Sequence, residues 1–272
     1  MKHLKKILCT MIAIAMLFSF AACGEEKTSQ DPMDIYLAAA EKNENLNDQD
    51  LTMVMDYTMD LDGQSIDVSS DIDAKIKDYN KDTMQMEMFM NMEMAGSTIA
   101  MNMYYVDGYY YMDTMGQKMK YSMDIQTMVE QLEGQLGVET FEKEMIQSIE
   151  ASEDGKTLTM VIDGKAMSKF MEQALASTLN TGSESGDITI DDIDCVLTLD
   201  DDGYIASQVM DFKMSMAMAL DAEGTNSEVA MTIHLEAQYN NIGKEVTIEL
   251  PDFSDYTDLG SYNDLMTQAG QE

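Results

Sequence analysis

Apolar and polar residues alternate with a period of two over long parts of this chain. In the first such run, Leu51 to Leu61, methionine, tyrosine and leucine alternate with aspartate and threonine. This pattern is typical of a β-strand with one face in a core and the other in water. Asp62-Gly63 follows directly and favours a tight hairpin turn. The pattern therefore predicts antiparallel strands, each beside the next.

The same alternation occurs on both sides of the middle of the chain. Turns at 95–96, 107–108 and 115–116 separate further short strands up to about residue 122. Strands return after about residue 187, and a last strand is predicted from Val246 to Leu250, which Pro251 ends.

Other segments have helical periodicity. Asp31-Pro32 marks the start of a helix that we expect to end near Asn47. Apolar residues spaced by three and four predict further helices over 125–136, 141–149 and 167–175. A strand from Thr157 to Ile162 separates the last two.

These elements predict an α+β protein. Antiparallel strands with one apolar face need a cover for that face, and the amphipathic helices can provide it. We expect a curved antiparallel sheet, an open half-barrel, with helices over its concave apolar face. Because no linker-like segment interrupts the pattern, we expect a single domain over residues 31–252 and a C-terminal tail over residues 253–272.

The first 22 residues have the pattern of a secretory signal. Three lysines precede an apolar run over residues 7–20, which is short for a membrane span. Ala21 and Ala22 stand directly before Cys23, and this arrangement resembles the lipobox of bacterial lipoproteins. The resemblance implies removal of residues 1–22, acyl chains such as palmitate on Cys23, and a tether over 23–30. An ordinary signal peptide and an uncleaved anchor are the alternatives.

Charge excludes some partners. The chain has 51 Asp and Glu against 16 Lys, no Arg, and a net charge of −35. Such a chain repels nucleic-acid phosphates and gains nothing from adsorption to an anionic membrane surface. We therefore expect no nucleic-acid partner, and attachment to the extracytoplasmic face of the cell membrane through the lipid alone.

Signatures of catalysis are absent from the sequence. It has no Gly-rich phosphate loop, no Gly-x-Ser-x-Gly and no His-Glu-x-x-His, so we expect neither an enzyme nor a cofactor. The acidic turns at 187–194 and 200–203 lack the spacing of a calcium loop, so we expect no metal there. Cys195 alternates with Ile193 and Leu197 and is typical of a small core residue.

Methionine is the distinctive residue, with 30 in the chain. Thioethers are flexible and adapt to varied apolar partners, so methionine rows on one strand face suit a cavity for a lipid or other apolar ligand. The candidate lining residues are Met84, Met86, Met88, Met90, Met92, Met94, Met101, Met103, Met210, Met214, Met216 and Met218.

Two other interpretations of the methionine rows stay open. They are also consistent with the core of a non-catalytic structural or interaction protein of the cell surface. Thioethers also select Cu(I), although methionines along one strand are splayed and no His or Cys reinforces them.

The order of these features resembles a known family. A lipobox, a short helix, a YYVDGYYYM hairpin from Tyr104 to Met112, mid-chain helices and a closing Glu-Leu-Pro at 249–251 are similar to Gram-positive surface lipoproteins of unknown function. More distantly, the layout resembles LolA-type lipoprotein carriers and the LppX lipid-binding lipoproteins. This resemblance implies an open half-barrel whose concave face can hold acyl chains.

Overall fold

The computed structural model describes residues 30–61, 63–136, 141–169, 188–219 and 226–269. The chain divides into two compact units, residues 1–30 and residues 31–272, and all helices and strands below belong to the second. The expected signal peptide and Cys23 lie outside the described residues.

Among the described residues, thirteen strands form one sheet. The first six are joined by short turns: β1 (Gln49–Leu61), β2 (Gln64–Lys77), β3 (Gln85–Met94), β4 (Ser97–Val106), β5 (Tyr109–Thr114) and β6 (Gln117–Ser122). The others follow in the second half of the chain: β7 (Ile146–Ala151), β8 (Thr157–Ile162), β9 (Ile188–Ile190), β10 (Ile193–Leu199), β11 (Ile205–Ala219), β12 (Asn226–Asn240) and β13 (Thr257–Ser261).

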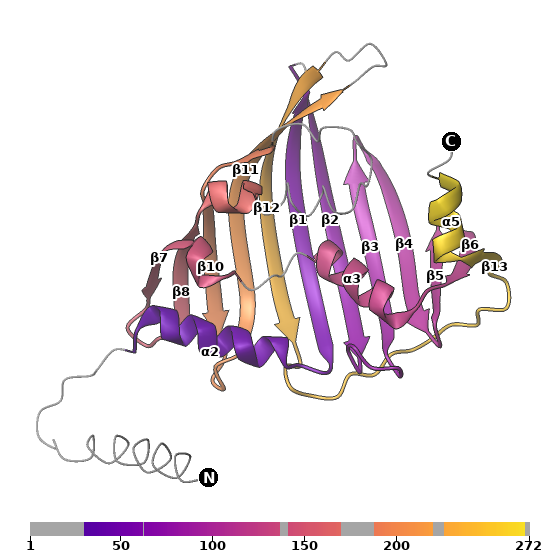
Figure 1. The fold of residues 1–272 in the computed structure, drawn as a ribbon, viewed down its shortest axis with the longest axis horizontal. Helices are drawn as coiled ribbons and strands as arrows, with labels where there is room; N and C mark the ends of the chain where they lie inside the picture. Colours follow the sequence, from indigo (N-terminus) through magenta and orange to yellow (C-terminus); the bar gives the residue numbers. More distant parts are fainter. Residues whose placement is uncertain (1–29, 62, 137–140, 170–187, 220–225, 270–272) are drawn as a thin grey trace, which may run out of the picture. The chain divides into compact units, whose positions relative to one another are not determined.

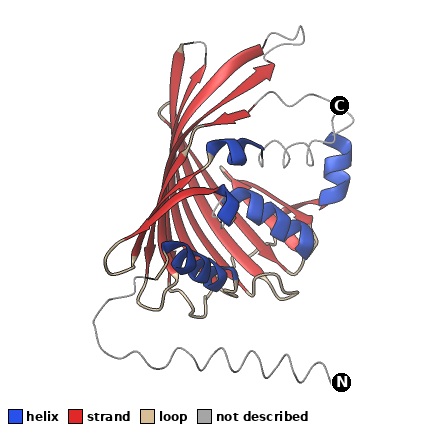
Figure 2. Ribbon diagram, turned by 60° about the vertical axis from the view of Figure 1, so that its left-hand side comes forward, coloured by secondary structure: helices blue, strands red, loops and turns tan. Residues whose placement is uncertain are grey.

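The sheet is open. Its strands lie in the order β13-β6-β5-β4-β3-β2-β1-β12-β11-β10-β8-β7, and β9 pairs with β11 outside this path. β13 is parallel to β6, and the other paired strands are antiparallel. Figures 1 and 2 show a curved sheet with the helices on its concave side. The predicted α+β class, an open antiparallel half-barrel with helices over its concave face, is confirmed.

Pairing of β1 with β12 joins the two halves of the sheet. It runs from Asp50 opposite Asn240 to Leu61 opposite Val229, so a strand near the end of the sequence lies beside the first strand. Hairpin signals predict pairing between consecutive strands, and they contain no information on this contact.

Three helices have described bounds: α2 (Pro32–Glu44), α3 (Ile125–Leu136) and α5 (Tyr262–Ala269). α2 begins as predicted, because the carboxylate of Asp31 accepts the N–H of Met33 at 3.0 Å and Pro32 occupies the first turn. Asp124 caps α3 by accepting the N–H of Thr127 at 2.9 Å, which holds the pKa of that carboxyl below its usual range. Residues 164–169 are also helical, and the rest of the helix predicted over 167–175 lies outside the described residues.

The helix predicted over 141–149 is wrong. A 3₁₀ turn at Lys143–Met145 leads into β7, which pairs with β8. The register of this pair shifts between Ile146 and Ser148, and Ile146 and Ile149 both pack against the core. A bulge of this kind puts residues three apart on the same face of a strand, which imitates the spacing of a helix.

The strand predicted from Val246 to Leu250 is also wrong. β12 already has β1 on one side and β11 on the other, so no edge is free beside it for a following hairpin strand. Residues 241–262, which we call the C-terminal strap, instead run along the ends of β1 to β6 to reach the far edge of the sheet (Figure 1). The segment expected to be a tail, 253–272, contains β13 and α5.

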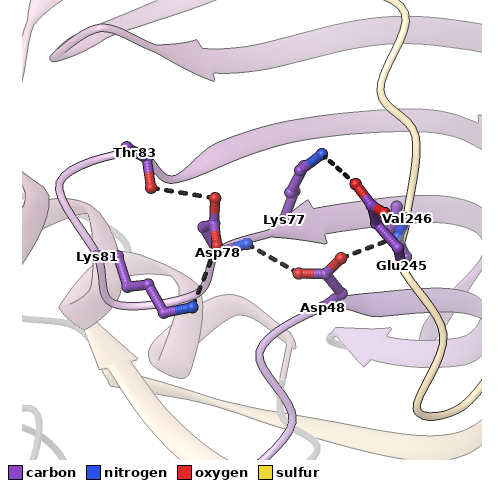
Figure 3. Close-up of polar contacts among 7 residues, drawn as sticks. All are labelled: Asp48, Lys77, Asp78, Lys81, Thr83, Glu245 and Val246. Atoms are coloured by element: carbon purple, nitrogen blue, oxygen red, sulfur yellow. Dashed lines mark hydrogen bonds and ion pairs between the residues drawn. The ribbon is translucent and has the colours of Figure 1, made fainter.

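Polar contacts fasten the beginning of the strap to the sheet (Figure 3). The carboxylate of Asp48 accepts the N–H of Asp78 at 3.0 Å and that of Val246 at 2.9 Å. Lys77 forms an ion pair with Glu245 at 3.0 Å. Asp48 therefore binds the turn after β2 and the strap together at the point where β1 begins.

Aromatic side chains fasten the middle of the strap to the outer, polar face. The ring of Phe253 stacks on that of Tyr111 with the centroids 3.8 Å apart, and it meets Tyr104 edge-on at 5.6 Å. Tyr256 is buried in the same small cluster. Tyr104, Tyr109 and Tyr111 of the YYVDGYYYM hairpin thus belong to a second, separate apolar cluster that holds the strap, whereas Tyr105 and Tyr110 are part of the main core.

Candidate functional site

The strand register brings the predicted methionine rows together on the concave face. Met88 lies opposite Met103 and Met90 lies opposite Met101 on β3 and β4. On the other half of the sheet, Met210 of β11 is opposite Leu235 of β12. By register, no charged residue of β1–β6 or β10–β12 lies on this face. On these strands the face is therefore uncharged and predominantly apolar.

Burial along this face changes from one end of the strands to the other. On β3 the side chain of Met88 is 2% exposed, whereas Met94 at the far end is 41% exposed. On β1, Met53 is fully buried and Met59 is half-buried. α2 and α3 contribute Tyr36, Met128 and Leu132 to the buried end, so the helices cover that end of the face.

The methionines predicted to line a cavity differ in burial in the same way. Met84, Met86, Met88, Met103 and Met210 are buried. Met90, Met92, Met101, Met214 and Met216 are half-buried, Met94 is exposed, and the surroundings of Met218 are outside the description. The buried members are core residues, whereas the half-buried members and Met94 leave side-chain surface in reach of a ligand.

The other end of the face forms a half-buried apolar surface on β1, β11 and β12. By register Met59 lies opposite Met231, and Met231 lies opposite Met214. We define this surface by its half-buried side chains, which are Met55, Tyr57, Met59, Phe212, Met214, Met216, Met231 and Ile233. Its β1 and β12 residues and Phe212 were not among the lining residues predicted from the sequence, although their alternation places them on the same face.

Two buried polar side chains lie on the same face. Ser70 of β2 is 5% exposed and Gln208 of β11 is 3% exposed. The Nε2 atom of Gln208 lies 3.2 Å from Sδ of Met210 and 3.9 Å from Sγ of Cys195. Sulfur is a weak acceptor, so these contacts pair the amide of Gln208 only weakly.

Cys195 is a core residue, as predicted. Its side chain is fully buried, and desolvation raises the pKa of its thiol to about 12. A thiol of this kind stays protonated and is a poor nucleophile at neutral pH.

A groove of about 740 Å³ is lined by polar residues of the outer face and by apolar residues such as Ile66 and Val68. Its lining includes Asp211 and His234, whose Oδ1 and Nδ1 atoms are 2.7 Å apart. Thr58 and Ser69 in the groove donate to Asp67 and Asp56 on the neighbouring strands. Within the described ranges, no three His, Cys, Asp or Glu side chains gather in a way that could hold a metal ion.

Fold and site together define a class of protein: an open, curved sheet with an apolar concave face that helices cover at one end. The chain belongs to DUF6612, a family of unknown function, whose sequence pattern matches residues 31–253. No curated protein matches the chain. Within the described residues, no helix combines the length and apolarity that crossing a bilayer would require.

Some solved structures are similar to this chain at low sequence identity. LprF from Mycobacterium bovis is 13% identical, with 82% of this chain and 98% of that chain covered and a TM-score of 0.44. A β-barrel-like protein with a DUF1849 domain from Brucella abortus is 10% identical, with 72% and 100% covered and a TM-score of 0.24. A DUF1329 family protein from Desulfovibrio piger is 8% identical, with 79% and 96% covered and a TM-score of 0.24. At these values the similarities carry no information on function.

Proposed function

We propose that this protein is a lipid-anchored extracytoplasmic lipoprotein that binds a lipid or another apolar molecule on the concave face of its sheet. The half-buried apolar surface is the observation that carries this proposal. Its side chains Met55, Phe212, Met214 and Met216 pack against the buried core, and the surface is less buried than the core. Apolar surface of this kind in a soluble domain commonly marks a ligand or partner site.

The chemistry of the surface favours acyl chains. Thioethers and aromatic rings line it, and by register no charged side chain of its strands points to this side. Each methylene buried there contributes roughly 0.8 kcal/mol. Flexible methionine side chains allow chains of different length to pack without strain. The proposed activity is binding without catalysis.

Anchoring rests on the sequence around Cys23. The basic start, the apolar run and the two alanines before Cys23 fit a lipoprotein of a Gram-positive cell membrane. Labelled palmitate should enter the wild-type protein in a bacterial host, and Cys23→Ser should abolish labelling. Labelling that persists in Cys23→Ser would contradict this part of the proposal.

Ligand binding is tested first by native mass spectrometry of the purified protein, followed by lipid extraction. A lipid in stoichiometric amount supports the proposal and identifies its class. The proposal is wrong if the folded protein has the mass of the chain without ligand and if this mass does not change after incubation with lipid vesicles. The methionine face is then a core, and the function lies with protein partners.

A matched pair of variants locates the ligand. Met214→Glu puts a charge on the half-buried apolar surface, whereas Ser215→Glu puts the same charge on the other face of β11. We expect Met214→Glu to weaken binding of a fluorescent fatty acid by at least about tenfold, a loss of about 1.4 kcal/mol. Ser215→Glu should bind as the wild type does. Equal effects would place the ligand elsewhere.

A further inference from the structure

Four methionines lie side by side across neighbouring strands. Met88 of β3 is opposite Met103 of β4, Met103 is opposite Met112 of β5, and Met112 is opposite Met119 of β6. Directly opposite residues in an antiparallel pair have Cβ atoms roughly 4.5–5.5 Å apart. This arrangement differs from the methionines along one strand, which are splayed, because here the side chains come from adjacent strands and can converge.

The row becomes more accessible toward the edge of the sheet. Met88 is 2% exposed and Met103 is 6% exposed, whereas Met112 and Met119 are half-buried. A small ion can therefore reach the outer thioethers without unpacking the core. Each methionine has three rotatable bonds, so neighbouring sulfur atoms can turn toward one ion.

A row of tyrosines runs beside the methionines. Tyr105, Tyr110 and Tyr121 lie opposite one another on β4, β5 and β6, two residues along from the methionine row. The rings of Tyr110 and Tyr121 stack with centroids 5.3 Å apart. Desolvation raises the pKa of Tyr121 to about 12, so its phenol stays neutral at physiological pH. Aromatic faces attract cations, and neutral phenols bring no anionic oxygen into the site.

The carboxylates of these strands belong to the other face. Glu87 and Glu93 of β3 and Asp113 of β5 alternate with the methionines. Hard cations such as Ca²⁺ and Mg²⁺ favour carboxylate oxygens, and by register β3–β6 have no carboxylate on this side. Thioether ligands select Cu(I) instead. The strongly negative charge of the chain raises the local concentration of any cation. The thioethers then select Cu(I) among these cations.

We propose that the thioethers of Met103, Met112 and Met119 form a binding site for Cu(I). Met112 is the central ligand because it is the direct neighbour of both others. The site is on β4–β6, whereas the half-buried apolar surface is on β1, β11 and β12. The two proposals are therefore independent.

The experiment is an anaerobic competition for Cu(I) between a chromophoric chelator and the full-length protein in detergent. Cys9, Cys23 and Cys195 are changed to Ala throughout, so that thiols do not contribute. Native mass spectrometry with Ag(I), a soft cation of the same charge, gives the stoichiometry. We expect at least one ion per chain, one of which depends on Met112, and sulfur neighbours in the X-ray absorption spectrum of bound copper.

Leucine variants remove single sulfur atoms at nearly constant volume, so folding is retained. Met112→Leu should weaken Cu(I) binding by at least about tenfold, or about 1.4 kcal/mol. Met53→Leu is the matched control, since Met53 is buried on the same face and by register has Ile72 and Ala237 as its neighbours. It should leave the affinity unchanged.

Three results would overturn the proposal: no Cu(I) uptake against the chelator, equal affinity in Met112→Leu and Met53→Leu, or copper with oxygen and nitrogen neighbours only. If Met112→Leu loses its circular dichroism spectrum, Met119→Leu takes its place. This residue is half-buried near the edge of the sheet, so its substitution disturbs packing least.

Discussion

Asn43 of α2 hydrogen-bonds both backbone groups of Ile205 at the start of β11. Its Nδ2 atom donates to the carbonyl oxygen of Ile205 at 3.0 Å, and the N–H of Ile205 donates to its Oδ1 atom at 2.8 Å. The side-chain amide thus replaces the backbone of a neighbouring strand. This pair fixes the end of the first helix to a strand 162 positions later in the sequence.

Asn43→Ala should destabilise the protein by about 2–4 kcal/mol. The substitution removes both partners of a buried backbone N–H and C=O, and each unpaired buried group costs about 1–3 kcal/mol. Urea denaturation followed by circular dichroism measures the difference. Asn45→Ala is the control, because Asn45 is exposed and donates to Glu41 within the same helix. It should cost no more than about 0.5 kcal/mol, and equal losses would show that the Ile205 contacts are unimportant.

Phe253→Ala should release the C-terminal strap. Phe253 provides the ring that stacks on Tyr111 and contacts Tyr104, so its removal opens the aromatic cluster of the outer face. For a half-buried ring we expect a loss of about 1–3 kcal/mol. Limited proteolysis should cut the variant faster between residues 241 and 262. Leu250→Ala, at a strap residue that is 38% exposed, should be cut at the wild-type rate.

Cys195 should not react with maleimide in the native protein. Burial keeps the thiol protonated, with a pKa of about 12 against 9.0 for an ordinary cysteine. Labelling at pH 8, followed by mass spectrometry, should be negligible in buffer and complete in guanidinium chloride. Native labelling at the rate of a free cysteine would contradict the position of Cys195 inside the sheet.

Alkaline pH should destabilise the fold above pH 10. Desolvation raises the pKa of Tyr36, Tyr121 and Tyr239 to about 12, whereas the unfolded value is 10.0. The folded state therefore holds these protons more tightly. The resulting stability is fully present below pH 10 and is lost as pH rises from 10 toward 12.

Two measurements check the alkaline prediction. Ionisation of these tyrosines should leave the urea midpoint of unfolding unchanged between pH 7 and pH 9. It should lower the midpoint above pH 10. Ultraviolet titration should show Tyr36, Tyr121 and Tyr239 ionising only after the exposed tyrosines. If every tyrosine of the chain ionised together near pH 10 with the fold intact, these three side chains would not be desolvated.

Some elements depend only on a few adjacent residues, whereas others depend on pairing with distant parts of the chain. The helix start at Asp31-Pro32 and the turn after Leu61 were predicted correctly, because capping and turn geometry depend on a few adjacent residues. The shared face of the β3 and β4 methionines was predicted for the same reason, since a strand alternates with a fixed period. The helix predicted over 141–149 failed because a bulge in β7 changed that period.

The candidate site shows the same division. The sequence identified Met103 as a residue of the apolar face, but it gave no reason to group Met103 with Met112 and Met119. Their contact follows from the register of β4, β5 and β6. Likewise, the difference in burial between Met88 and Met94 depends on which end of the strands the helices cover.

By itself, the sequence determined the α+β class, the strands of the first half, the helix at residue 32 and the apolar face. These properties arise from periodicity and from local backbone chemistry, which act within about ten residues along the chain. Only the tertiary structure decided that β12 lies beside β1, that the strap crosses to β6, and which thioethers meet. These contacts join residues far apart in sequence, and their energies depend on burial that exists only once the whole sheet has formed.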